Sequence, residues 1–146
     1  MALSLRSKLK ELPKVTKWVN GKVTDEDLKN RIVLFHFWSI SCGMCKDSFE
    51  DLKEIKRKYK DVFLVGIHMP RSEEDTNLEK VEEEIKKYAL KHPQALDNTH
   101  SMTDLFENEY VPSFYLYDKN GLLRHRSAGQ NALTLLNKTL ERVVLE

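Results

Sequence analysis

The sequence predicts an α/β protein in which a largely parallel central sheet lies between layers of helix. Residues 31–38, RIVLFHFW, and 62–67, VFLVGI, are near-continuous apolar runs rich in branched and aromatic side chains. Such runs are typical of strands buried on both faces. Between and after them, apolar residues recur at helical spacing. Strands that alternate with helices in this way predict a three-layer sandwich.

The first half of the chain predicts a hairpin, a strand and a long helix. Residues 18–23, WVNGKV, contain Asn-Gly, a favoured tight-turn dipeptide, and so predict an N-terminal β-hairpin. Thr24 is a suitable N-cap for a short helix beyond it. After the strand at 31–38, one helical face is formed by Cys45, Phe49, Leu52, Ile55 and Tyr59.

The second half adds two strands and three helices. Helices are predicted over 78–88 and 101–107, and residues 113–117, SFYLY, predict a strand. The turn DKNG at 118–121 lets the chain pair back as an antiparallel edge, so the sheet is mixed. The apolar face of a C-terminal helix is formed by Leu133, Leu136, Leu140 and Val143.

Composition favours one domain over residues 1–146, with residues 1–14 as an N-terminal extension. The chain has 40% apolar and 32% charged residues, which is ordinary for a globular protein. Its net charge of +1 gives no indication of nucleic acid or an anionic membrane as a partner.

The two cysteines are expected to work in a reducing compartment. No apolar stretch approaches the roughly 20 residues that cross a bilayer, and the start of the chain lacks a secretory signal pattern. We therefore expect a cytoplasmic protein, in which structural disulfides are rare. Catalysis, redox sensing or metal binding then explains a C-x-x-C pair better than stapling does.

Cys42 and Cys45 follow the strand at 31–38, at the start of the next helix. Backbone N–H groups and the helix dipole there favour a thiolate at Cys42, so we expect its pKa to lie below about 8.5. Cys45 lies about one turn deeper. This spacing suits an attacking thiol at Cys42 and a resolving thiol at Cys45.

Two other interpretations of the cysteine pair are weaker. Structural zinc usually needs four ligands, but the chain has no second cysteine pair and its five histidines lack H-x3-5-H spacing. Two inert buried thiols would not explain why the pair falls where open α/β sheets place their sites.

Pro112, just before the strand at 113–117, is by itself an ordinary strand-start proline.

The order of these motifs resembles the thioredoxin superfamily over residues 15–145. The chain has FW at 37–38, CGMCK at 42–46, VPS at 111–113 and Gly129 in that order. Longer strings are similar to the TlpA/ResA-type branch, in particular to YkuV-type cytosolic thiol-disulfide oxidoreductases; they are WSISC at 38–42, HMPRSE at 68–73 and FENEYVP at 106–112. The resemblance implies a thioredoxin fold with an α/β segment inserted between the C-x-x-C helix and a cis-proline strand.

The resemblance also implies roles for the residues of the site. Cys42 is expected to be the nucleophile and Cys45 the resolving thiol. Pro112 is expected to be cis, with its loop facing the disulfide and keeping metals away. The Val111 backbone would pair with a substrate chain in a short β-like contact. The expected substrate-binding set is Trp38, Gly43, Met44, Val111 and Pro112.

Two departures from the superfamily lie beside the cysteines. Ser41 stands where the family usually has tryptophan directly before the first cysteine. Met44 stands where thioredoxin has proline, so the start of the helix is less rigid. We therefore expect a reduction potential unlike that of thioredoxin.

Two hypotheses account for His36 in the expected site. It lies on the same strand face as Leu34 and Trp38, at the position where thioredoxin carries a buried aspartate. One hypothesis is that neutral His36 accepts the Cys45 proton, because the ordinary imidazole pKa of about 6.5 lies near neutrality. The other is a core histidine satisfied by hydrogen bonds, with no role in turnover.

The sequence thus predicts a cytoplasmic thiol-disulfide oxidoreductase that acts mainly as a reductase of protein disulfides. Its redox group is the Cys42–Cys45 disulfide, without metal or organic cofactor. Electrons would come from a thioredoxin reductase or small thiols, and a monomer is expected. A redox sensor or non-catalytic interaction module remains an alternative. A thiol peroxidase is weaker, because only Ser39 stands where such enzymes carry a threonine before the cysteine.

Overall fold

A six-stranded mixed sheet forms the middle layer of the protein. In this computed structural model, which describes residues 2–146, the strand order is β1-β4-β3-β2-β5-β6. The strands β2, β3 and β4 run parallel, and the other three pairings are antiparallel. The strand bounds are β1 Lys17–Val19, β2 Val33–Trp38, β3 Phe63–His68, β4 Gln94–Leu96, β5 Ser113–Tyr117 and β6 Leu123–Ala128.

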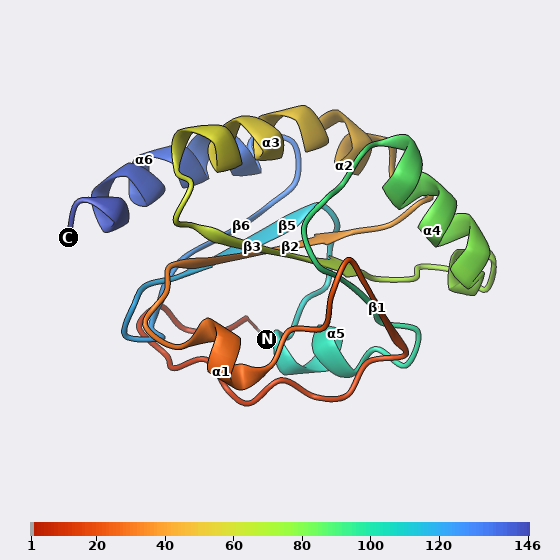
Figure 1. The fold of residues 1–146 in the computed structure, drawn as a ribbon, viewed down its shortest axis with the longest axis horizontal. Coiled ribbons are helices and arrows are strands. Elements are labelled where there is room, and N and C mark those ends of the chain that lie inside the picture. The colour runs from red at the N-terminus through yellow and green to blue at the C-terminus, as the bar shows by residue number, and fades with distance from the viewer. Residues whose placement is uncertain (1) are drawn as a thin grey trace.

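Helices cover both faces of the sheet, as Figure 1 shows. One face carries α2 (Gly43–Asp47), α3 (Phe49–Lys58), α4 (Leu78–Lys87) and α6 (Ala132–Val144). The other face carries α1 (Asp25–Leu28) and α5 (Ser101–Leu105), and a 3-10 turn, η1, spans Glu74–Thr76. Each face therefore has its own apolar core, and both cysteines belong to the core beneath α3 and α6.

The predicted strands and helices recur with small changes of boundary. The thioredoxin-like fold, the mixed sheet and the antiparallel edge β6 are confirmed. The predicted cysteine helix is divided at Ser48, which ends α2 and begins α3. Thr24 caps α1 as expected, in a reciprocal capping box with Asp27.

The predicted N-terminal hairpin is wrong. Asn20 and Gly21 do turn the chain, with φ of 64° and 106°. The strand before that turn pairs instead with β4, so that Trp18 lies opposite Ala95. Asn20 explains this choice, because its amide donates to the carbonyls of Leu90 and His92 at 2.6 and 3.2 Å. The turn is thus fixed to the chain that leads into β4.

The N-terminal extension lies along the outer edge of the sheet. Arg6 donates its backbone N–H to the Leu123 carbonyl at 2.7 Å, and Leu123 donates back to Ser7 at 2.9 Å. Lys8 forms an isolated bridge with Leu122. These bonds cover the start of the edge strand β6. Within residues 2–146, no helix is long and apolar enough to span a bilayer.

Candidate active site

The cysteine pair lies at the carboxyl end of β2, in the middle of the sheet. Cys42 is the N-cap of α2, and its sulfur accepts the Cys45 backbone N–H at 3.1 Å. The sulfur therefore faces the unpaired donors at the start of the helix, as predicted from the spacing. This is the position where backbone dipoles stabilise negative charge.

Cys42 and Cys45 form a disulfide, and the two residues differ in exposure. Their Cα atoms are 5.3 Å apart. Cys42 is 5% exposed and Cys45 is fully buried. Cys45 packs among the residues of the core under α3, including Phe49 and Leu52. An incoming sulfur therefore meets Cys42 first.

The loop before β5 lies beside the end of β2. Phe37 pairs with Ser113 in the antiparallel β2–β5 register, so Pro112 follows at the level of Trp38. The Val111–Pro112 peptide bond is cis. Ser113 donates its hydroxyl to the Tyr110 carbonyl at 2.5 Å, which closes the loop. The Tyr110 side chain is 67% exposed at this end of the sheet.

The expected substrate-binding residues divide into an exposed and a buried group. Gly43 is exposed, Met44 is 44% exposed, and Val111 is half-buried. Trp38 is only 1% exposed, and its indole N–H donates to the Gln94 amide oxygen at 2.9 Å. The substrate contact of Trp38 therefore stays a prediction, for a ring that is buried in the disulfide form. The Trp38 ring packs edge-on against the rings of Phe49 and His68.

His36 lies beneath the site and is hydrogen-bonded to a second histidine. The two Nε2 atoms of His36 and His92 are 2.7 Å apart. Gln94 approaches the same His92 nitrogen at 2.9 Å through its amide nitrogen. Because Trp38 donates to the oxygen of Gln94, that amide nitrogen can only donate to His92. His92 Nε2 therefore accepts, and His36 Nε2 is the donor.

Gly66 makes room for this network. In the sheet register, Gly66 lies between His36 on β2 and Gln94 on β4. A Cβ atom at this position would overlap the Gln94 side-chain amide. A glycine inside a strand often marks such a close approach. The side chains from β2 and from the chain around β4 thus meet across β3.

Burial keeps these histidines neutral. Burial is the main cause that lowers the pKa of His36 well below 6.5, and the neighbouring His92 adds to it. Burial also lowers the pKa of His92 to about 4, with a further contribution from Lys56. At neutral pH the pair therefore carries no charge. One Nε2–H lies between them, which fits the donor and acceptor roles above.

The turn between β2 and Cys42 is held by residues that follow β3. Ile40 donates its N–H to His68 Nε2 at 3.1 Å, and Ser39 donates its hydroxyl to the Met69 carbonyl. The Ser41 hydroxyl is hydrogen-bonded to the side chains of Asp75 and Arg71. The sequence did not predict the contacts of Asp75 and His92. Both lie far along the chain from their partners, and a single sequence carries no signal for such contacts.

Within residues 2–146, no group of three or more His, Cys, Asp or Glu side chains is placed to hold a metal ion. The redox-active group that the structure shows is the disulfide itself. The Nε2 atom of His68 accepts the Ile40 backbone N–H and is therefore not a free metal ligand.

The fold and the cysteine pair define a thioredoxin-like protein with a dithiol–disulfide site. More specifically, the chain belongs to the AhpC/TSA family, whose model matches residues 8–126. It is 42% identical to Thiol-disulfide oxidoreductase YkuV of Bacillus subtilis over 146 residues, which cover 99% of each chain. It is 26% identical to Thiol-disulfide oxidoreductase ResA of Bacillus cereus, over 92% of this chain and 77% of ResA.

Solved structures give the same result for the fold. The solution structure of a thioredoxin-like protein in the oxidised form matches with a TM-score of 0.88 at 41% identity, covering 98% of each chain. A thiol:disulfide interchange protein DsbE from Chlorobium tepidum matches with a TM-score of 0.84 at 19% identity, over 97% of this chain and 99% of that one. The second match supports the fold alone.

Proposed function

We propose that this protein reduces disulfide bonds of other proteins in the cytoplasm. Its class, thiol-disulfide oxidoreductase, follows from the full-length relative YkuV and the ResA relative. The observation that carries the proposal is the C-x-x-C disulfide, in which Cys42 is 5% exposed and Cys45 is fully buried. We propose that Cys42 reacts with the substrate and that Cys45, which is buried, acts as the resolving thiol.

The chemistry follows from this arrangement. In the reduced protein, the Cys42 thiolate attacks one sulfur of a substrate disulfide and releases the other as a thiolate, which takes a proton from water. Cys45 then loses its proton and attacks Cys42, which frees the second substrate thiol. The substrate gains two electrons and two protons, and Cys42–Cys45 becomes the disulfide.

His36 is proposed as the acceptor of the Cys45 proton. Its side chain lies on the sheet face that carries Cys45, with its ring centroid 6.5 Å from that of Phe49, which packs in the same core as Cys45. Burial keeps His36 neutral and lowers its pKa well below 6.5, so we propose that it holds the proton only while Cys45 attacks Cys42. Its Nε2–H is given to His92, which leaves the Nδ1 lone pair for the incoming proton.

The substrate would meet an apolar and largely main-chain surface. Met44 and Tyr110 are exposed on the two segments next to Cys42, and the Val111 backbone lies at the start of a strand. Gly43 adds no side chain, so an extended peptide can approach the sulfur. Main-chain pairing beside Pro112 depends little on the side chains of the substrate. We therefore propose broad specificity for protein disulfides.

The direction of electron flow is proposed from the expected compartment. In a reducing cytoplasm, a thioredoxin reductase or small thiols would return electrons to Cys42–Cys45. The protein would act as a monomer, with no membrane or nucleic-acid partner. The reduction potential of the couple in glutathione buffers tests the direction. A value near that of thioredoxin, about −270 mV, supports a reductase, and one near about −120 mV reverses it.

Repeated turnover separates this enzyme from a redox sensor. The protein is expected to reduce insulin disulfides many times with dithiothreitol as the electron source. Cys42→Ser should abolish this activity, and Cys45→Ser should instead accumulate a mixed disulfide on Cys42. A single stoichiometric oxidation without turnover would identify a sensor or interaction module and contradict the proposal.

A thiol peroxidase is the second candidate, because the AhpC/TSA match includes the cysteine region. Ser39, which stands where peroxidases carry a threonine, argues against it. The Ser39 side chain is fully buried, and its hydroxyl donates to the Met69 carbonyl. It is therefore not available to a peroxide at Cys42. Consumption of hydrogen peroxide at rates comparable to insulin reduction would favour the peroxidase.

A further inference from the structure

Two opposite charges meet on the residue directly before Cys42. The Ser41 hydroxyl donates to Asp75 Oδ2 at 2.7 Å. The Arg71 guanidinium donates to the same hydroxyl through Nε at 3.2 Å and Nη2 at 3.1 Å. The Arg71 backbone N–H also donates to Asp75 Oδ2, at 2.9 Å. Ser41, Asp75 and Arg71, hereafter the Ser41 network, therefore form one connected unit.

The two charges lie in different surroundings. Asp75 is buried at 2% exposure on the 3-10 turn η1, whereas Arg71 is exposed. The segment that carries them is itself fixed. Asn98 donates to the Thr76 carbonyl at 3.0 Å, and His100 Nε2 lies 2.9 Å from the Pro70 carbonyl. Both charges are therefore held in place beside the redox loop.

Two other charged residues, Lys46 and Asp47, lie on α2 close to Cys42. Lys46 on α2 forms an ion pair with Glu84 of α4, with 3.6 Å between Nζ and Oε1. His68, which holds the Ile40 N–H, is neutral because burial lowers its pKa to about 4. Arg71 and Asp75 are thus the charges that the fold attaches directly to the loop before the nucleophile.

We infer that the Ser41 network is a positioning device that sets how readily Cys42 ionises. Arg71 favours the thiolate and Asp75 opposes it, and the Ser41 hydroxyl holds both charges on the residue directly before Cys42. A nearby cation lowers the pKa of a thiol, and a nearby anion raises it. The inference rests on the proposed function, in which Cys42 is the attacking thiol.

The test is the pKa of Cys42 in the reduced protein, measured from thiolate absorbance or from alkylation rates across pH. Arg71→Met should raise it by about half a pH unit, because Arg71 is exposed, and Asp75→Asn should lower it by at least about as much, because Asp75 is buried. The reduction potential should fall in Arg71→Met and rise in Asp75→Asn, since a stable thiolate stabilises the reduced form.

Matched variants separate charge from loop structure. Arg71→Lys keeps the charge and should stay within about 0.2 pH units of the parent, while Arg71→Glu should shift the pKa further upward than Arg71→Met. Glu54 and Arg57 form an exposed pair on α3. Arg57→Met and Glu54→Gln make the same charge changes there and should leave the Cys42 pKa unchanged, because such charges are screened beyond about 10 Å.

Equal shifts in the same direction for Arg71→Met and Asp75→Asn would show that the network only holds the loop, and would overturn the inference. So would a Ser41→Ala shift larger than both, or no upward shift in Arg71→Glu. These measurements need no substrate. If insulin turnover fails in the parent while the opposite shifts remain, the proposed function fails and the inference stands.

Discussion

At the scale of single residues, Gly66 shows how an absent side chain supports the site. Gly66→Ala would push its Cβ into the Gln94 amide, which holds both Trp38 and His92. Overpacking of a closed core lowers the free energy of unfolding by about 1–3 kcal/mol. Urea unfolding measures this loss. Gly43→Ala is the matched control, because its Cβ would meet nothing within 4 Å; a similar loss there would contradict the explanation.

His36 offers a second prediction at this scale. If His36 accepts the Cys45 proton, His36→Ala should slow resolution of the mixed disulfide by about tenfold or more. His36→Asp keeps a base at this place and should recover part of the rate, with a changed pH profile. Rates of thiol-disulfide exchange across pH measure both effects.

The His92→Gln variant controls for packing around His36. It disturbs the 2.7 Å contact between the two histidines but leaves the imidazole of His36 in place. If His36→Ala and His36→Asp gave the pH profile of the parent, His36 would be a core histidine without a role in turnover. A loss of rate only in His92→Gln would also contradict the proposed role.

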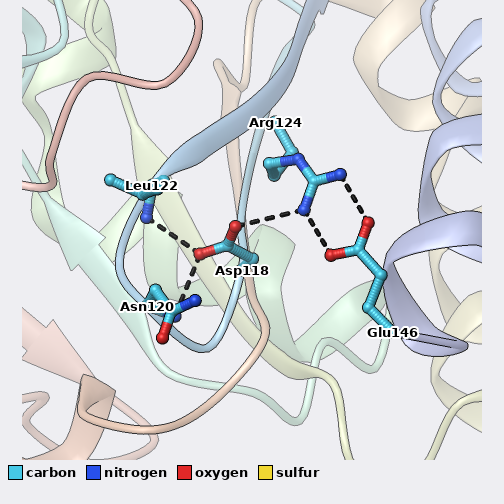
Figure 2. Close-up of polar contacts among 5 residues, drawn as sticks. All are labelled: Asp118, Asn120, Leu122, Arg124 and Glu146. Carbon is cyan, nitrogen blue, oxygen red and sulfur yellow. Dashed lines mark hydrogen bonds and ion pairs between the residues drawn. The ribbon is translucent and has the colours of Figure 1, made fainter.

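At the scale of elements, the end of α6 is tied to the β5–β6 hairpin by Arg124, whose side chain is 7% exposed. Figure 2 shows Arg124 between two carboxylates. It contacts Asp118 at 3.1 Å and Glu146 at 2.6 Å through each of two nitrogens. Asp118 in turn accepts the backbone N–H groups of Asn120 and Leu122, which close the hairpin turn.

Removal of this arginine should destabilise the protein. The side chains of Arg124 and Asp118 are 7% and 9% exposed, so Arg124→Met leaves Asp118 as a buried carboxylate without its ion partner. Breaking a buried pair costs about 3–5 kcal/mol, and the half-exposed Glu146 adds less. Urea unfolding measures the loss. Arg142→Met on the exposed side of α6 should change stability by less than about 0.5 kcal/mol, and equal losses in both variants would contradict the prediction.

Local patterns predicted most elements, and distant contacts account for the failures. The dense apolar runs at 31–38 and 62–67 identified β2 and β3 because strands buried on both faces leave that signal. The strand β4 has three residues and includes a polar Gln94 that is buried, so its pattern is too short to recognise. The hairpin failed because β1 pairs with this same unrecognised strand.

In the candidate site, too, local sequence predicted the cysteines but not their distant neighbours. Cys42 and Cys45 were predictable because their geometry depends on a strand followed directly by a helix. The partners His92 and Asp75 reach His36 and Ser41 across 56 and 34 residues of chain. Only the folded sheet brings them together. The burial of Trp38 follows from its place at the end of the apolar run at 31–38, and its contact with substrate stays a prediction.

At the scale of the whole molecule, the buried histidines should make stability sensitive to mild acid. Burial lowers the pKa of His68 and of His92 to about 4, and that of His36 well below 6.5. In the unfolded chain these imidazoles titrate near 6.5. Between these values the unfolded state binds protons that the folded state does not, so the free energy of unfolding falls as pH falls.

The expected result is full stability above about pH 7 and a decline below about pH 6.5, of up to about 1.4 kcal/mol per pH unit for each buried histidine. Urea unfolding of the oxidised protein at pH 7.5, 6 and 5 measures it, in a range where carboxylates remain ionised. Burial also lowers the pKa of His125, so His92→Gln removes one of four such groups and should reduce the slope by about a quarter. The sign is fixed by the chemistry, because a buried neutral base resists protonation whereas an exposed one does not. Stability that stayed constant from pH 7.5 to 5, or that rose in acid, would mean that these side chains reach water in the folded protein.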